Sequence, residues 1–137
     1  MNYLGLDCST LAVHGVLIAP DESIVKKYKW GSKKKSFEER LPEILLGFSE
    51  AAIFVQNHKV AITLGYVVGA VWLSLLQAGI DTVKIDNRQW KKVVLNKGNA
   101  TKQDIKDYAI DKWGDIFPEQ DFADAACIAL WNKRRTD

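Results

Sequence analysis

The chain has 137 residues, 47% of them hydrophobic, which is enough for one domain with a sizeable core and too little for two. The formal net charge of +2 is nearly neutral and by itself indicates no class of partner. The two cysteines, Cys8 and Cys127, lie in apolar segments, which excludes a disulfide scaffold and indicates a reducing, cytosolic compartment.

Three short strands are predicted at the start of the chain, where no secretory signal is visible. They cover Tyr3–Asp7, Ala12–Ile18 and Ile24–Trp30. Polar residues at Ser9-Thr10 and at Pro20-Asp21-Glu22 separate them and are typical of turns. The pattern predicts an antiparallel meander.

The middle of the chain predicts a helix, a buried strand and a second helix. Ser36 is a candidate N-cap, with Glu39 three residues later as in a capping box. The apolar run Ala51–Val55, which ends at Gln56-Asn57-His58, has the character of a strand buried on both faces. Thr63–Gln77 is apolar nearly all round and contains glycines and polar residues, so it predicts a buried helix and not a membrane span.

Small residues on this second helix favour close packing with another helix. Gly65 and Gly69 lie four residues apart on one face, and Trp72 follows on the next turn. Packing within the chain and a subunit interface both explain this pattern, and the sequence leaves the two alternatives open.

The last third alternates between strand and helix. It predicts a short strand at Asp81–Ile85, a basic helix at Asn87–Val94, a helix at Lys102–Trp113 capped by Thr101, and a final helix from Asp121. The whole order predicts a single α/β domain over residues 1–137. Its mixed sheet would have five strands, three antiparallel and then two parallel, with helices on both faces.

Positive charge is concentrated in two segments. Twelve of the 19 Lys and Arg residues lie in Lys26–Lys35 and Lys84–Lys102. Two basic blocks on an otherwise acidic background indicate a surface that binds a polyanion, most often nucleic acid. Solvated lysines on a loop and a helix are the simpler alternative.

Three aspartates stand next to apolar segments at opposite ends of the chain. Asp7 ends the first strand, and Asp121 and Asp124 lie three residues apart on one face of the last helix. A carboxylate held out of water must be protonated, bonded or matched by positive charge. If the fold brings the three together, a divalent cation would satisfy them.

Five motifs occur in an order that resembles the RuvC family of Holliday junction resolvases, within the ribonuclease H-like superfamily. They are Gly5-Leu6-Asp7, Leu64-Gly65 with Gly69, Arg88-Gln89-Trp90-Lys91, Gly98-Asn99-Ala100-Thr101-Lys102, and Asp121-Phe122-Ala123-Asp124-Ala125. The likeness covers essentially the whole chain, and its compact size favours a phage or mobile-element type.

The resemblance implies a homodimeric endonuclease of DNA recombination and repair that nicks opposed strands of a four-way DNA junction. Four carboxylates of the family hold two Mg²⁺ ions, which Mn²⁺ can replace. By the resemblance, Asp7 would bridge the metals and Asp121 and Asp124 would complete the site. Gly65, Gly69 and Trp72 would contribute to the dimer interface.

The fourth carboxylate is missing, because Gln56 stands where the family has a glutamate. Glutamine keeps a carbonyl oxygen but removes the charge on which Mg²⁺ affinity mainly depends. Either the natural protein has lost this ligand or the sequence is a Glu-to-Gln variant made to trap substrate, and the intact remainder of the site favours the variant. We predict that the chain as written cleaves poorly.

The resemblance also gives roles to the basic residues. Lys91 and Lys102 correspond to lysines near the scissile phosphate, where they would neutralise phosphate charge. The wider set expected to contact DNA is Lys33, Lys34, Lys35, Arg88, Lys91, Lys92, Lys97 and Lys102.

Three other functions fit parts of the sequence. A related nuclease could act on forks, flaps or RNA–DNA hybrids with the same chemistry, and a catalytically silent protein could bind junctions without cutting them. The opening Gly5-Leu6-Asp7-Cys8-Ser9-Thr10 also resembles that of actin-type and sugar-kinase-type nucleotide-binding proteins. Those folds need a second lobe that 137 residues do not provide.

Overall fold

The computed structural model describes residues 1–9, 11–31, 56–57 and 62–136, with the backbone alone for 56–57 and 62–67. Strands β1 (Tyr3–Cys8), β2 (Val13–Ile18) and β3 (Ile24–Trp30) form an antiparallel meander. Two short strands, β4 (Gln56–Asn57) and β5 (Lys84–Ile85), continue the sheet in parallel with β1, giving the order β3-β2-β1-β4-β5.

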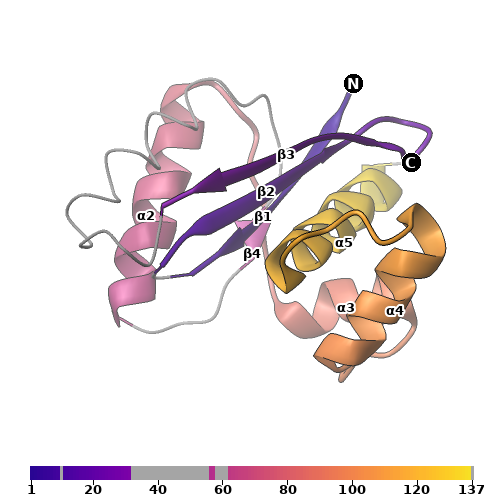
Figure 1. Cartoon of the computed structure of the whole chain (residues 1–137). Helices are drawn as coiled ribbons and strands as arrows, with labels where there is room; N and C mark the ends of the chain where they lie inside the picture. The colour runs from indigo at the N-terminus through magenta and orange to yellow at the C-terminus, as the bar shows by residue number, and fades with distance from the viewer. Residues whose placement is uncertain (10, 32–55, 58–61, 137) are drawn as a thin grey trace.

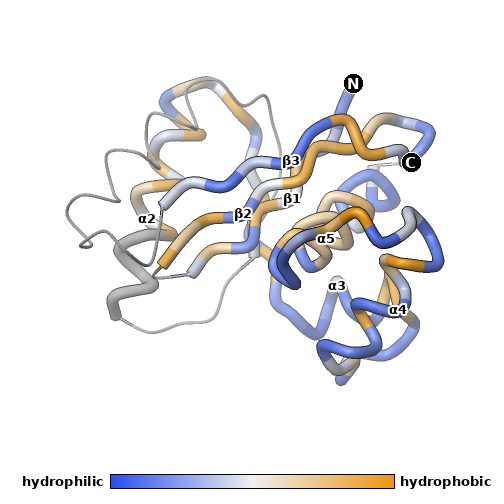
Figure 2. Tube along the Cα trace, in the orientation of Figure 1, coloured by the Kyte–Doolittle hydropathy of each residue, from blue (hydrophilic) through white to orange (hydrophobic). Residues whose placement is uncertain are grey.

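Helices cover both faces of the sheet (Figure 1). On one face α2 (Ile62–Gln77) packs on β1. On the other, α5 (Gln120–Thr136) packs on β1 and β2, and α3 (Asn87–Leu95) and α4 (Lys102–Trp113) pack on α5. Figure 2 shows hydrophobic runs along β1 and β2 and largely hydrophilic α3 and α4, consistent with an outer position for these two helices.

The strand alternation divides the core between the two faces. Leu4, Leu6 and Cys8 of β1 belong to the cluster that packs on α2, whereas Tyr3 belongs to the cluster on α5. Successive side chains of a strand point to opposite faces, so Gly5 and Asp7 lie on the α5 face with Tyr3. The strand thereby carries its carboxylate toward α5 while its leucines fill the other core.

The predicted α/β fold, with three antiparallel strands and helices on both faces, is confirmed. β3 and α4 have the predicted bounds, whereas β5 is shorter than the predicted Asp81–Ile85. At the start of the predicted segment, the Thr82 hydroxyl donates a hydrogen bond to the backbone carbonyl of Ile80, as in a turn. The predicted helix from Ser36 and the predicted strand Ala51–Val55 lie outside the described residues.

A close approach between β1 and α5 fixes the geometry of the sheet face. A Cβ added to Gly5 would lie 1.9 Å from the carbonyl oxygen of Ala125 and 2.4 Å from the amide nitrogen of Ala129. Only glycine fits there, because the obstacle is helix backbone and not a movable side chain. This contact holds the first turns of α5 beside the end of β1, where Asp7 lies.

Capping boxes define the starts of α3 and α4. The Asp86 side chain accepts from the backbone amide of Arg88, and the Gln89 side chain accepts from the backbone amide of Asp86. At the start of α4, the side chains of Thr101 and Asp104 each accept from the backbone amide of the other residue. These caps satisfy amides that would otherwise have no partner at each helix start. Among the described residues, no helix has the length and apolar character required to cross a bilayer.

Candidate active site

Three carboxylates meet at the end of β1. Asp7, Asp121 and Asp124 are each partly buried, and their nearest oxygens all lie within 4.8 Å of one another. Asp121 and Asp124 stand one helical turn apart at the start of α5, as their spacing predicted. The arrangement brings together residues that are more than a hundred positions apart in the sequence.

Crowding and burial disfavour the ionised form of two of these groups. Desolvation raises the pKa of Asp7 well above its ordinary value, and the charges of Asp124 and Asp121 raise it further. Desolvation also raises the pKa of Asp124, and the charge of Asp121 adds to this rise. The protein therefore holds negative charge where a cation would relieve both the desolvation and the repulsion.

Two lysines partly compensate this charge. The charge of Lys102, the first residue of α4, lowers the pKa of both Asp7 and Asp124, and Lys91 of α3 lowers that of Asp124. These effects leave both carboxyl pKa values above their ordinary range. Gln120 donates from Nε2 to Asp124 Oδ1 at 3.3 Å and orients that carboxylate.

The chemistry of the three side chains fits a hard divalent cation. Carboxylate oxygens are the ligands that Mg²⁺ and Mn²⁺ prefer, and three of them within 4.8 Å can share a cation or a pair of cations. Nearby Lys91 and Lys102 would remain available for the negative charge of a phosphate. The described residues thus place oxygen ligands and positively charged side chains at one end of the sheet, a combination that can bind metal ions and phosphate together.

The neighbouring strand β4 brings the position of the missing glutamate to this edge of the sheet. Gln56 pairs with Leu6, and Asn57 pairs with Asp7. Paired positions on adjacent strands share one face of the sheet. By this register, position 57 lies on the face of Asp7 and position 56 on the face of Leu6.

The predicted DNA-binding residues are spread over α3, α4 and the loop between them. Arg88, Lys92 and Lys102 are exposed and Lys91 is partly exposed. Lys97 is exposed too, but its Nζ lies 3.0 Å from Asp104 Oδ2, so an acid of α4 already holds it. The block Lys33, Lys34 and Lys35 lies outside the described residues.

The outer face of α2 carries the residues predicted for a dimer interface. Gly69 is exposed, with nothing within 4 Å of a Cβ added to it, and Trp72 is partly exposed. Leu73 and Leu76 are each 56% exposed on the same helix. Gly65 lies on the first half of α2. The described part of this face is therefore apolar and open.

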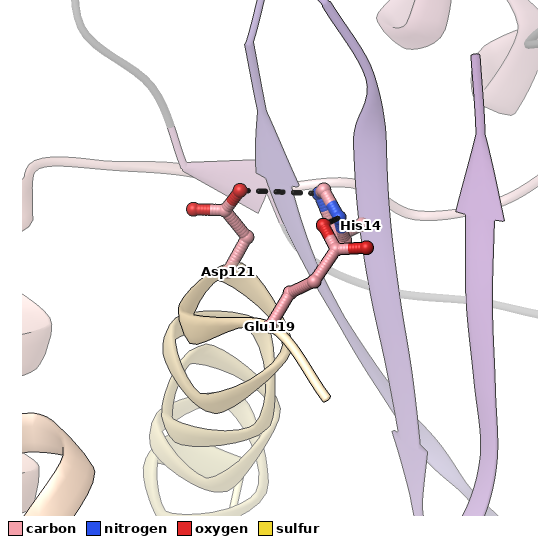
Figure 3. A group of neighbouring side chains, drawn as sticks. All are labelled: His14, Glu119 and Asp121. Carbon is pink, nitrogen blue, oxygen red and sulfur yellow. Dashed lines mark hydrogen bonds and ion pairs between the residues drawn. The ribbon is translucent and has the colours of Figure 1, made fainter. Parts of the chain in front are cut away.

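Two residues that sequence reasoning missed lie beside the carboxylates. His14 on β2 is the antiparallel partner of Asp7, and Glu119 precedes α5. Figure 3 shows the His14 ring between the carboxylates of Glu119 and Asp121. These three residues form a second group whose possible ligand atoms lie within 4.8 Å of one another. The hairpin register, in which Cys8 pairs with Val13, was the signal that could have found His14.

No protein-family model and no curated protein matches the chain. Several solved structures match the chain. RuvC of Thermus thermophilus matches with a TM-score of 0.82 at 17% identity, covering 99% of this chain and 97% of that one. The same protein in complex with a Holliday junction substrate matches with a TM-score of 0.77 at 19% identity, covering 96% and 92%.

A poxvirus enzyme shares the fold. The fowlpox virus resolvase, in complex with substrate Holliday junction DNA, matches with a TM-score of 0.60 at 12% identity over 99% of each chain. At these identities the likeness establishes the fold. Solved structures similar to this chain include RuvC and a viral Holliday junction resolvase, and its fold is RuvC-like, as the five sequence motifs predicted.

Proposed function

We propose that the chain is a single-domain, structure-specific endodeoxyribonuclease that resolves four-way DNA junctions. The convergence of Asp7, Asp121 and Asp124 beside Lys91 and Lys102 carries the proposal, because it supplies oxygen ligands and phosphate-neutralising charge at one place. The likeness to RuvC and to the fowlpox virus resolvase, both solved in complex with a Holliday junction, adds the substrate class. A DNA substrate and two buried, unpaired thiols suit the cytoplasm.

Asp7, Asp121 and Asp124 would hold the divalent cations, Mg²⁺ or Mn²⁺. When bound, two such ions would supply an activated water and stabilisation of the leaving 3′ oxygen. The protein's own contribution is to present three carboxylates at one place, and the raised pKa values of two of them, Asp7 and Asp124, indicate that these two favour ionisation when positive charge is near. Gln120 would keep Asp124 oriented through its hydrogen bond.

Lys91 and Lys102 would contact the phosphate to be cut. Their charges already act on the carboxylates, so a phosphate drawn to the same place would lie within their reach. Arg88 and Lys92, both exposed on α3, would contact the DNA backbone beyond it. Lys97 would join them only after leaving Asp104.

Paired nicking would require two copies of the chain. The open face of α2, with Gly69, Trp72, Leu73 and Leu76, offers an apolar surface for a second copy. Related by a two-fold axis, two such faces would be self-complementary and would place two carboxylate clusters on one junction. Each cluster would cut one of two opposed strands.

Gln56 should make the chain a poor nuclease, and restoring a carboxylate should recover activity. The resemblance assigns the missing ligand to position 56, whereas the β4 register pairs Asp7 with position 57. Gln56→Glu and Asn57→Glu are therefore matched variants. The resemblance predicts that Gln56→Glu raises the nicking rate at least about 10²-fold over the unaltered chain, the size of effect typical of a lost catalytic group, whereas the register predicts this gain for Asn57→Glu.

A panel of substrates tests the proposed activity. The unaltered chain and both glutamate variants would be incubated with Mg²⁺ and a four-way junction, a fork, a flap or an RNA–DNA hybrid of matched sequence. We expect the more active glutamate variant to cut the junction at symmetry-related positions in preference to the others. Preference for a fork, flap or hybrid would instead support the related nuclease. Tight junction binding without cutting by either variant would support the silent binding protein.

A further inference from the structure

His14 is almost completely buried, with 3% of its surface exposed. Its Nε2 lies 2.9 Å from Glu119 Oε2, and its Nδ1 has no hydrogen-bond partner among the described residues. A buried polar atom without a partner costs about 1–3 kcal/mol, so such atoms are rare and call for an explanation. The unpartnered atom here faces a carboxylate, as Figure 3 shows.

Glu119 fixes the tautomer of the ring. Lys29 Nζ donates to its Oε1 at 2.5 Å, and the His14 ring donates to its Oε2. Each oxygen of Glu119 faces a nitrogen, Nζ of Lys29 or Nε2 of His14, so the carboxylate acts as an acceptor toward both. With an Nε2 proton directed to Glu119, Nδ1 is the ring nitrogen that can offer a lone pair to a cation.

The spacing between Nδ1 and Asp121 fits two ligands of one cation. His14 Nδ1 lies 3.6 Å from Asp121 Oδ2, too far for a hydrogen bond, for which about 2.7–3.2 Å is usual. Two ligands at about 2.1 Å from one metal ion lie about 3.0–3.6 Å apart when the angle between them is about 90–120°. A bare lone pair facing a carboxylate is repulsive unless positive charge lies between them.

The space beside these atoms can hold an ion with its water. A cavity of ≈ 60 Å³ is lined by Ser9, Leu11, Ala12, His14, Lys29, Glu119 and Asp121. A water molecule needs about 10–15 Å³ of such open volume, so the cavity has room for a cation and a few water ligands. Ser9 already makes turn hydrogen bonds with Ala12, which leaves His14 and Asp121 as the protein ligands.

We propose that His14 Nδ1 and Asp121 form a second, nitrogen-containing cation site next to the carboxylate cluster. Glu119 holds the ring from the far side, the arrangement known from carboxylate–histidine–metal groups. An imidazole ligand favours metals such as Zn²⁺ or Ni²⁺ over Mg²⁺. Asp121 belongs to both groups of possible ligands, so the two sites share this carboxylate.

The native chain itself provides the test, with histidine labelled by the NMR-active nitrogen isotope and Zn²⁺ as the probe. The sequence has two histidines, so His58 serves as an internal reference. We expect long-range proton–nitrogen spectra to show Nε2 of His14 protonated and Nδ1 bare, and Zn²⁺ to shift the Nδ1 signal with saturation at one ion. Mg²⁺ should shift the Nδ1 signal far less than Zn²⁺ does, because Mg²⁺ prefers the carboxylate oxygens. Protons on both ring nitrogens, or an unshifted Nδ1 at saturating Zn²⁺, would overturn the proposal.

A pair of variants separates ligation from general effects on folding. Glu119→Gln removes the charge that holds the ring, and we expect it to weaken Zn²⁺ binding about 10–100-fold. Asp111→Asn, an exposed change on α4, should leave Zn²⁺ binding unaltered. Equal Zn²⁺ affinity in Glu119→Gln and the native chain would contradict the role of Glu119. Junction cutting with Mg²⁺ is a separate readout, so this proposal and the proposed nuclease function can fail independently.

Discussion

At the scale of single residues, the buried carboxylate Asp7 should destabilise the fold when no cation is bound. Its pKa is raised in the folded chain, so the unfolded chain loses this proton at lower pH than the folded chain does. The contribution of Asp7 to the free energy of unfolding is therefore most favourable below the ordinary carboxyl pKa. It falls as the pH rises from there through the raised pKa of the folded chain. The pKa of Asp124 is also raised, so its contribution to stability changes with pH in the same direction.

Replacing Asp7 by Asn should stabilise the metal-free protein and remove its response to metal. With a chelator present, we expect Asp7→Asn to increase the free energy of unfolding by about 1–2 kcal/mol near pH 7, with a smaller gain near pH 4. Urea denaturation at both pH values measures this. Mg²⁺ should then stabilise the native chain and not the variant, whereas a gain independent of pH would contradict the account.

At the scale of elements, the contact between Gly5 and α5 positions the carboxylate cluster. Gly5→Ala would push helix backbone away from β1, and we expect a loss of at least about 2 kcal/mol of stability together with loss of metal-dependent stabilisation. Gly98→Ala is the matched control, because the nearest atom to its added Cβ is Arg88 O at 3.5 Å. Thermal unfolding that ranks the two variants equally would refute the role of Gly5.

The sequence predicted elements and local geometry better than contacts between distant segments. The spacing of Asp121 and Asp124 on one helix face is local, and the RuvC-like motifs indicated that Asp7 would meet them. His14 lies opposite Asp7 because of the hairpin register, a local property that was overlooked. The bond between Glu119 and His14 joins residues 105 positions apart and depends on how α5 crosses β2. Periodicity carries no information on such a crossing.

At the scale of the whole molecule, the exposed face of α2 should hold two copies of the chain together. We expect Leu73→Glu with Leu76→Glu to convert a dimer into a monomer, because burying these charges at an apolar interface is costly. Ile110→Glu, at a comparably exposed apolar position on α4, should leave the dimer intact. Sedimentation equilibrium distinguishes these results, and an unchanged mass of the double variant would contradict the proposed interface.

The carboxylate cluster as a metal-dependent nuclease site is tested most directly by single-turnover nicking of a four-way junction. The comparison is between the more active of the two glutamate variants, Gln56→Glu or Asn57→Glu, and the same variant with Asp124→Asn, each with Mg²⁺ and with a chelator. We predict paired nicks by the glutamate variant only when Mg²⁺ is present, and at least about 10²-fold slower nicking after the loss of Asp124. Equal nicking by the two variants, or nicking that persists in the chelator, would contradict the account.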